Sequence, residues 1–212
     1  LAANRLFVEK SSSGTSKYVG KIFSERGSYR VPHVIEQTRD GIIYLSFTRF
    51  KRIPVIPIIK ALGLMKDSEI AHSISGEQQY DDVFINLFDC VDVKTEKDAI
   101  EYLSKRIGVQ PMENKHEKTY ENIDRYLLPH LGTEAKDRLL KSINLCKMVK
   151  RFLGVAKGGV PPMDKDHYMN KSLKLSGDLL GDLFRVNLRA LVNDILYNFQ
   201  RLVKRGKFQS LK

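Results

Sequence analysis

A ten-residue stretch rich in glycine and proline divides this chain more sharply than any other part of its sequence. Residues 154–163 read Gly-Val-Ala-Lys-Gly-Gly-Val-Pro-Pro-Met. Neither a helix nor a strand continues easily through paired glycines followed by paired prolines, because glycine is conformationally free and proline lacks an amide donor. We therefore predict a boundary here, with one domain before it and a separate segment after it.

The segment after this boundary is the longest periodic one in the chain. Over residues 178–204, apolar side chains recur every three to four positions, namely Leu180, Leu183, Phe184, Leu188, Leu191, Ile195, Phe199 and Leu202. This spacing predicts an amphipathic helix about 40 Å long, at about 1.5 Å per residue. Because its apolar stripe needs a cover, we expect self-association or partial order near residues 178–204 where no partner is present.

The first third of the chain has the alternation of a small antiparallel sheet. Short runs of alternating apolar and polar side chains recur there, at residues 5–9, 18–24, 29–39 and 42–48. Asp40 and Gly41 separate the last two runs. An Asp-Gly pair between alternating runs is typical of a hairpin turn, because both residues tolerate positive φ.

Beyond the sheet the period becomes helical. Pro54 and Pro57 interrupt an apolar run, which predicts an extended edge leading into a helix near Pro57. Further helical patterns cover residues 68–75, 81–90, 95–107, 119–128 and 134–153. For the last of them we predict an apolar stripe made of Leu139, Leu140, Ile143, Met148 and Phe152. A small antiparallel sheet followed by a helical cluster predicts an α+β fold.

The charge of the chain favours a polyanionic partner. The formal net charge is +11, and it is uneven: +7 over residues 1–60, −1 over residues 61–162 and +5 over residues 163–212. A body with one or two cationic faces suits nucleic acid. A basic surface that only maintains solubility is the alternative.

The two cysteines, Cys90 and Cys146, lie in apolar stretches without a CxxC neighbour or a histidine at ligand spacing. We predict buried thiols rather than a disulfide or a zinc site, and hence a reducing compartment, the cytoplasm. No apolar run approaches the roughly 20 residues that span a membrane.

One acidic cluster could carry metal or acid–base chemistry. Asp164 and Asp166 stand two positions apart, with His167 beside them. Paired carboxylates can hold Mg²⁺, and an imidazole can act as a base. The same residues also suit the start of a helix, where Asp166 caps the backbone and the acids meet the positive end of the dipole. We favour the second interpretation; the first would make the chain a metal-dependent nuclease.

Basic residues gather near the expected strand ends, with Tyr29 and Phe50 beside them. They are Arg26, Arg30, Arg49, Lys51 and Arg52. Cations next to aromatic rings suit contact with nucleic-acid phosphates and bases. The alternative is that charge protects a sheet edge from pairing with another strand.

The acidic cluster also opens a longer motif. Residues 164–180 read DKDHYMNKSLKLSGDLL. This resembles the pattern D-x-D-H-x-x-x-[KR]-R-L-x-x-x-G-x-L-L of the second-largest subunit of multisubunit DNA-directed RNA polymerases, closest to the archaeal type. The matching positions include Asp164, Asp166, His167, Leu173 and Gly177. Leu183-Phe184-Arg185 follows the motif. In that family, the long helix after the motif likewise begins with Leu-Phe-Arg or Leu-Phe-Lys.

Two further matches follow the order of the family. Residues 52–63 resemble its I-P-[IV]-x-I-[IV]-x-R-A-L-G segment, and residues 4–8 resemble the stretch where the chain enters the lobe. Ser172 departs from the pattern, because the family usually has arginine there. Any contact made by that guanidinium is in doubt here, and Lys171 would compensate for it in part as a nucleic-acid contact.

The resemblance implies a non-catalytic part of a nucleotidyltransferase. Residues 10–163 would form the lobe, and residues 1–9 and 164–212 would be segments of the protrusion, a domain left incomplete here. Both domains line the DNA cleft, so the expected partners are DNA, the other polymerase subunits and transcription factors. The catalytic Mg²⁺ belongs to the largest subunit in this family, so no metal is expected on this chain. A free-standing basic nucleic-acid-binding or scaffold protein is the alternative.

Overall fold

The computed structural model describes residues 6–11, 14, 16–26, 29–48, 50–76, 80–107, 115–164, 166–171 and 173–205. The chain divides into two compact units, Leu1–Asn170 and Lys171–Lys212. Each unit is described by itself.

In the part of the first unit that the structure describes, five strands come first: β1 (Phe7–Lys10), β2 (Ser16–Arg26), β3 (Tyr29–Thr38), β4 (Ile43–Phe47) and β5 (Phe50–Pro54). They pair antiparallel in chain order, as the alternating runs predict. The predicted turn at Asp40-Gly41 joins β3 to β4. Gly41 has a φ of +86° and donates its N–H to the carbonyl of Thr38. This left-handed conformation explains the glycine.

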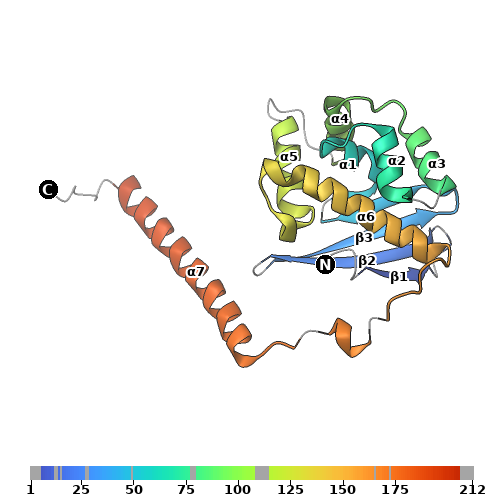
Figure 1. The fold of residues 1–212 in the computed structure, drawn as a ribbon. Helices are drawn as coiled ribbons and strands as arrows, with labels where there is room; N and C mark the ends of the chain where they lie inside the picture. Colours follow the sequence, from blue (N-terminus) through green and yellow to red (C-terminus); the bar gives the residue numbers. More distant parts are fainter. Residues whose placement is uncertain are drawn as a thin grey trace. The chain divides into compact units, whose positions relative to one another are not determined.

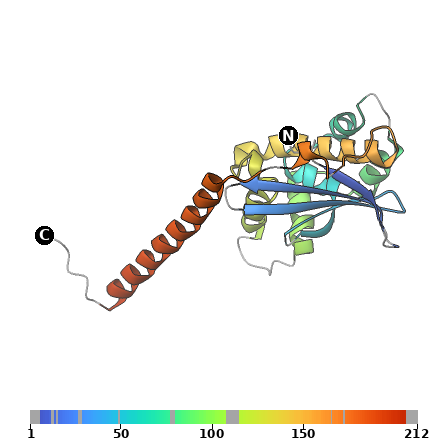
Figure 2. The same ribbon diagram turned by 90° about the horizontal axis from the view of Figure 1, so that it is seen from below.

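The described residues that follow contain the helices α1 (Val55–Ala61), α2 (Asp67–Ser75), α3 (Asp81–Asp89), α4 (Glu96–Ile107), α5 (Lys115–Tyr126) and α6 (Arg138–Ala156), with the short 3₁₀ turns Pro129–Leu131 and Ala135–Asp137 before α6. They lie on one side of the sheet (Figure 1), and seen from below the strands lie in front of them (Figure 2). The α+β prediction is therefore confirmed. Thr95 and Asp98 exchange side-chain-to-backbone bonds of 2.9 and 3.2 Å and so cap α4.

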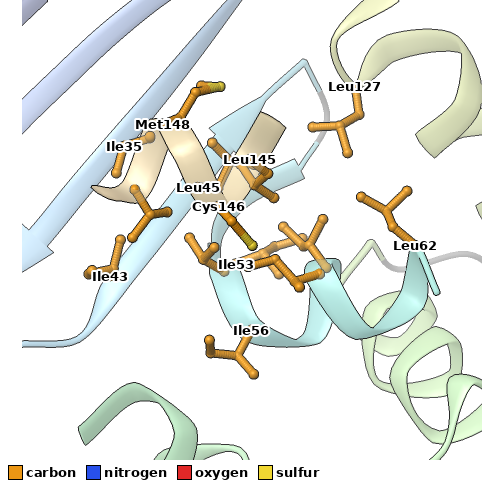
Figure 3. Close-up of a cluster of buried hydrophobic side chains, with 14 of the residues drawn as sticks. Ile35, Ile43, Leu45, Ile53, Ile56, Leu62, Leu127, Leu145, Cys146 and Met148 are labelled. Atoms are coloured by element: carbon orange, nitrogen blue, oxygen red, sulfur yellow. The ribbon is translucent and has the colours of Figure 1, made fainter. Parts of the chain in front are cut away.

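The core lies between the sheet and the helices. Ile35 and Leu45 enter it from the strands, and Leu145, Cys146 and Met148 enter it from α6 (Figure 3). Cys90 is buried too, and both cysteines are free thiols, as predicted. Burial raises the pKa of each thiol to about 12, so both stay protonated and behave as small apolar groups.

The predicted apolar stripe of α6 is wrong over its first half. Leu139, Leu140 and Ile143 are exposed, whereas Met148 and Phe152 are buried as expected. The side of the helix that faces the core carries Lys141 in this half. Lys141 is accommodated because its Nζ donates a 2.6 Å bond to the carbonyl of Asp124. A polar contact with α5 therefore accommodates a lysine on the inner side of this half of the helix, where the apolar period predicts none.

The second unit contains one long helix, α7 (Ser176–Lys204), which confirms the helix predicted for residues 178–204. Within this unit no other described element covers the apolar stripe, and Leu183, Leu188 and Ile195 are exposed. Asp178 accepts a 3.1 Å bond from the backbone N–H of Leu175 at the start of the helix. Among the described residues, no helix combines the length and the apolar character that crossing a membrane requires.

Candidate nucleic-acid interface

The outer face of the sheet, on the side away from the helices, carries two of the predicted basic residues. On β3 the residues Val31, His33, Ile35 and Gln37 are buried against the helices. Side chains alternate along a strand, so Arg30 and Glu36 point to the other face. Arg52 on β5 reaches the same face, because its guanidinium lies 3.7 Å from the Glu36 carboxylate.

The two guanidinium groups on this face are already engaged. Arg30 forms a 3.0 Å ion pair with Glu25, its direct cross-strand neighbour, and lies 4.3 Å from the ring centroid of Phe23. Arg52 forms a longer, 3.7 Å ion pair with Glu36, two strands away, and lies 5.4 Å from the centroid of Tyr44. The Arg30 pair is solvent-exposed and contributes little to stability, and the Arg52 pair is partly exposed. Each ion pair does, however, neutralise positive charge that could otherwise attract a phosphate.

The positive charges of Arg26 and Lys51 are not neutralised by an ion pair with a described residue. Arg26 stands at the end of β2, and its Nη1 donates a 2.9 Å bond to the Thr133 hydroxyl. Lys51 is exposed on β5. Neither has a carboxylate partner among the residues that the structure describes. These two are therefore the predicted basic residues best able to take a phosphate.

Among the described residues of the first unit, the predicted basic side chains lie on more than one side of the sheet. Arg26 lies on the side of the sheet that faces Thr133, and Arg30 and Arg52 lie on the outer face. Lys171 belongs to the second unit, where it is exposed, and Arg49 lies outside the described residues. Which of them contact DNA stays a prediction.

The motif residues of the acidic cluster act on the local backbone. Asp164 Oδ1 accepts a 2.8 Å bond from the N–H of Asp166, and His167 Nδ1 accepts a 3.2 Å bond from the N–H of Met169. Asn170 Nδ2 donates to the Asp164 carbonyl. These bonds shape the 3₁₀ turn Tyr168–Asn170. The predicted helix start is therefore found only as this short turn, because α7 begins at Ser176, and the side chain that accepts the 2.8 Å bond belongs to Asp164 rather than Asp166.

The same cluster is a poor fit for a metal ion. The Asp164 and His167 atoms named above already accept backbone hydrogen bonds. No group of three histidine, cysteine, aspartate or glutamate side chains gathers into a ligand set within the described ranges. Leu173 and Gly177 belong to the second unit, and Lys165 and Ser172 lie outside the described residues.

A serine–histidine pair in the first unit has a structural explanation. Ser24 Oγ lies 2.7 Å from His130 Nδ1 and also accepts the His130 backbone N–H at 3.4 Å. Ser24 is buried, and burial lowers the pKa of His130. A nucleophilic serine needs access to substrate and a group that orients its base. This pair instead fastens the end of β2 to the turn at Pro129–Leu131.

Known proteins are similar to this chain over all or nearly all of its length. A family model described as RNA polymerase Rpb2, domain 2, matches residues 2–174. A DNA-directed RNA polymerase subunit Rpo2 from Saccharolobus solfataricus is 36% identical over 100% of this chain and 19% of its own length. Subunits Rpo2N from Halobacterium salinarum and Methanothermobacter thermautotrophicus are 37% and 39% identical, over 98% and 100% of this chain. The chain spans 41% and 46% of these two relatives, so it corresponds to a part of each.

Proposed function

The chain belongs to the Rpb2 family of second-largest DNA-directed RNA polymerase subunits, and from this membership we propose that it is a non-catalytic module lining the DNA cleft of such a polymerase. The observation that carries the proposal is similarity along the entire chain to subunits of one enzyme. Nucleotide transfer would need the remaining subunits and their Mg²⁺, and this chain by itself is expected to be inactive.

We further propose that residues 10–163 form the lobe and that residues 1–9 and 164–212 belong to the protrusion. The end of the family match at residue 174 and the division of the chain after Asn170 support a boundary near the proposed one. The pairing of β1 with β2 joins residues 7–9 to the sheet of the proposed lobe, so this part of the chain does not support a separate protrusion segment before residue 10.

Contact with DNA would be electrostatic and independent of base sequence. The net charge of +11 supports it, as do Arg26 and Lys51, which form no ion pair with a described carboxylate. Each phosphate contact releases counterions, so the logarithm of the binding constant falls linearly with the logarithm of salt concentration, by about 0.9 per contact.

We expect the chain to bind non-specific duplex DNA weakly and with a steep salt dependence. Lys51→Gln should reduce the slope of the salt titration by about one contact, in the manner of a lost phosphate partner. Lys66→Gln is the matched control, because Lys66 is also exposed on the surface but already pairs with Glu69 at 2.9 Å. Fluorescence anisotropy of a labelled duplex measures both slopes.

Reconstitution with the remaining polymerase subunits completes this test. Incorporation into an active polymerase together with salt-sensitive DNA binding supports the cleft-wall proposal. Incorporation without DNA binding would leave a scaffold whose charge faces other subunits. Tight DNA binding without incorporation would favour a free-standing nucleic-acid-binding protein and sink the proposal.

The apolar stripe of α7 leads to a prediction about the isolated chain. Its large side chains are exposed within the second unit, so we expect the chain to self-associate at micromolar concentration. Replacing Leu188 and Leu191 together by glutamine should weaken this association at least about tenfold, as loss of a central apolar anchor does. Sedimentation velocity measures it, and Arg201→Gln on the same helix is the control. A monomeric chain with uniformly protected α7 amides in hydrogen exchange would contradict the prediction.

A further inference from the structure

One stretch of this basic chain is strongly acidic. Between Lys66 and Lys94 the sequence contains no lysine or arginine, yet it holds seven carboxylates, namely Asp67, Glu69, Glu77, Asp81, Asp82, Asp89 and Asp92. The chain has 36 basic residues in all, so their complete absence here is a local feature of the surface. Helix α3 and the turn that follows it lie at the end of this stretch.

Helix α3 is apolar on two opposite sides. Val83 and Leu87 face the core and are buried. The opposite side carries Phe84, Ile85 and Phe88, and Val91 follows in the turn, with exposed fractions of 53%, 43%, 81% and 50%. Two phenylalanines and two aliphatic side chains therefore stand in solvent side by side on one short segment. Contiguous exposed apolar groups of this kind mark interaction surfaces.

Carboxylates are interleaved with these apolar side chains. At about 100° per residue, the order around the helix is Phe84, Phe88, Asp81, Ile85, Asp89. Asp81 thus lies between the aromatic and aliphatic parts, and Asp89 lies at their margin. We call this set, with Val91 and Asp92, the α3 face.

The charges of the α3 face are uncompensated. The other described acids of the stretch have cations: Asp67 pairs with Lys60, Glu69 with Lys66 and Asp82 with Lys157, at 2.9, 2.9 and 2.7 Å. By contrast, Asp81, Asp89 and Asp92 have no cationic partner in the part of the chain that the structure describes. A phosphate backbone would be repelled here, which excludes nucleic acid as the occupant.

The face is also held rigidly. Asn86 is buried beneath it and accepts a 2.7 Å bond from the Ile43 N–H while donating 3.0 and 2.6 Å bonds to the carbonyls of Gly41 and Asp82. The bonds to Ile43 and Gly41 fasten α3 to the β3–β4 turn, and the bond to Asp82 lies within α3. A surface that is ordered before binding loses less entropy on association, so it is suited to docking.

We propose that the α3 face binds a basic, apolar segment of a separate polypeptide, one that places leucine-like side chains against Phe84, Ile85 and Phe88 and lysine or arginine beside Asp81 and Asp89. Apolar burial at the centre with charge pairs at the margin is the arrangement of protein–protein interfaces. The proposal does not depend on the DNA-binding role, which falls to other parts of the surface.

A synthetic peptide tests whether the α3 face of this chain binds a basic, apolar helix. The peptide is a labelled amphipathic helix of leucine and lysine, about 18 residues or five turns long. The control peptide is the same helix with glutamate in place of lysine. Phe88→Ser should lower the affinity for the leucine–lysine helix at least about tenfold, as loss of a central aromatic anchor does. Asp81→Asn combined with Asp89→Asn should flatten its salt dependence. Leu140→Ser on α6, an exposed apolar residue elsewhere, should leave the affinity within about twofold.

The proposal fails if the glutamate helix binds as well as the lysine helix, or if Phe88→Ser binds as tightly as the parent chain.

Photocrosslinking then identifies the occupant. Benzoylphenylalanine replaces Phe88 in the subunit assembled into polymerase with its factors, and Phe23 on the outer sheet face is the control position. An adduct to a lysine- or arginine-rich segment of another polypeptide supports the proposal. An adduct only to the same subunit, to a second copy of it or to nucleic acid overturns it, as does labelling no stronger than at Phe23. Failure of the polymerase to assemble would count against the proposed function, while the binding of the probe helix would still decide this inference.

Discussion

Phe152→Ala is expected to lower the free energy of unfolding of the first unit by about 3–5 kcal/mol, the usual cost of emptying a fully buried aromatic site. Phe152 is completely buried on α6. Its ring lies against Gly20 on β2: a Cβ added at Gly20 would stand 2.8 Å from Phe152 Cδ2 and 3.4 Å from Leu6 Cδ1. The helix therefore approaches the sheet closely at the one point where the strand has no side chain.

This geometry predicts coupling between the two positions. Gly20→Ala by itself should destabilise the unit by about 1–3 kcal/mol, because the added methyl overlaps the ring. In the Phe152→Ala background the methyl has room, so its cost should largely disappear or reverse. Residues in direct contact show such non-additivity.

Urea unfolding of the four proteins in this cycle measures the coupling. Phe23→Ala is the control for β2, because Phe23 is half exposed on the outer face and should change stability by less than about 1 kcal/mol. Additive costs for Gly20→Ala and Phe152→Ala would show that the ring does not rest on the glycine. A change in the denaturant slope would instead indicate an altered unfolded state.

The order of elements in this fold was predictable because the signals are local. The alternation of β2 to β4, the Asp40-Gly41 turn and the apolar period of α7 all lie within short windows of sequence. The orientation of α6 was not predictable in this way. Its inner side carries Lys141, whose partner is the carbonyl of Asp124 in α5, and no window on α6 contains that partner.

The candidate interface was predictable only by residue type. Basic residues at strand ends can be recognised in the sequence, but the pairing of Arg30 with Glu25 depends on the register between β2 and β3. The α3 face was missed for another reason. The net charge summed over residues 61–162 is −1, which conceals the seven carboxylates between Lys66 and Lys94. A sum over a shorter window reveals this acidic stretch.

Acidification should destabilise the first unit through His33. This imidazole is fully buried; its Nδ1 donates to the Val31 carbonyl and its Nε2 accepts the Leu128 N–H, both at 3.1 Å. Leu128 has a φ of +44°, a left-handed conformation that costs a non-glycine residue free energy. The bond to His33 therefore helps to hold the chain in that conformation, and it requires the neutral ring.

Burial lowers the pKa of His33 to about 4, from an ordinary value of 6.5. Below pH 6.5 the imidazole binds a proton in the unfolded chain, whereas in the folded chain it binds one only near pH 4. The stabilisation is therefore complete above pH 6.5 and is lost as the pH falls towards 4. The expected loss is about 3 kcal/mol, at about 1.4 kcal/mol per pKa unit. His33→Gln should be less stable at neutral pH and should lose this part of the pH dependence.

Urea unfolding at a series of pH values compares the parent chain with His33→Gln. Ile35→Val, a neighbour on the same face of β3, is the control: it should cost about 1 kcal/mol and leave the pH dependence intact. Parallel stability curves for the parent and His33→Gln between pH 7 and 4 would contradict the assignment. So would an NMR titration of the His33 ring near its ordinary pKa, because a ring that gains a proton there cannot be the acceptor that holds Leu128 in place.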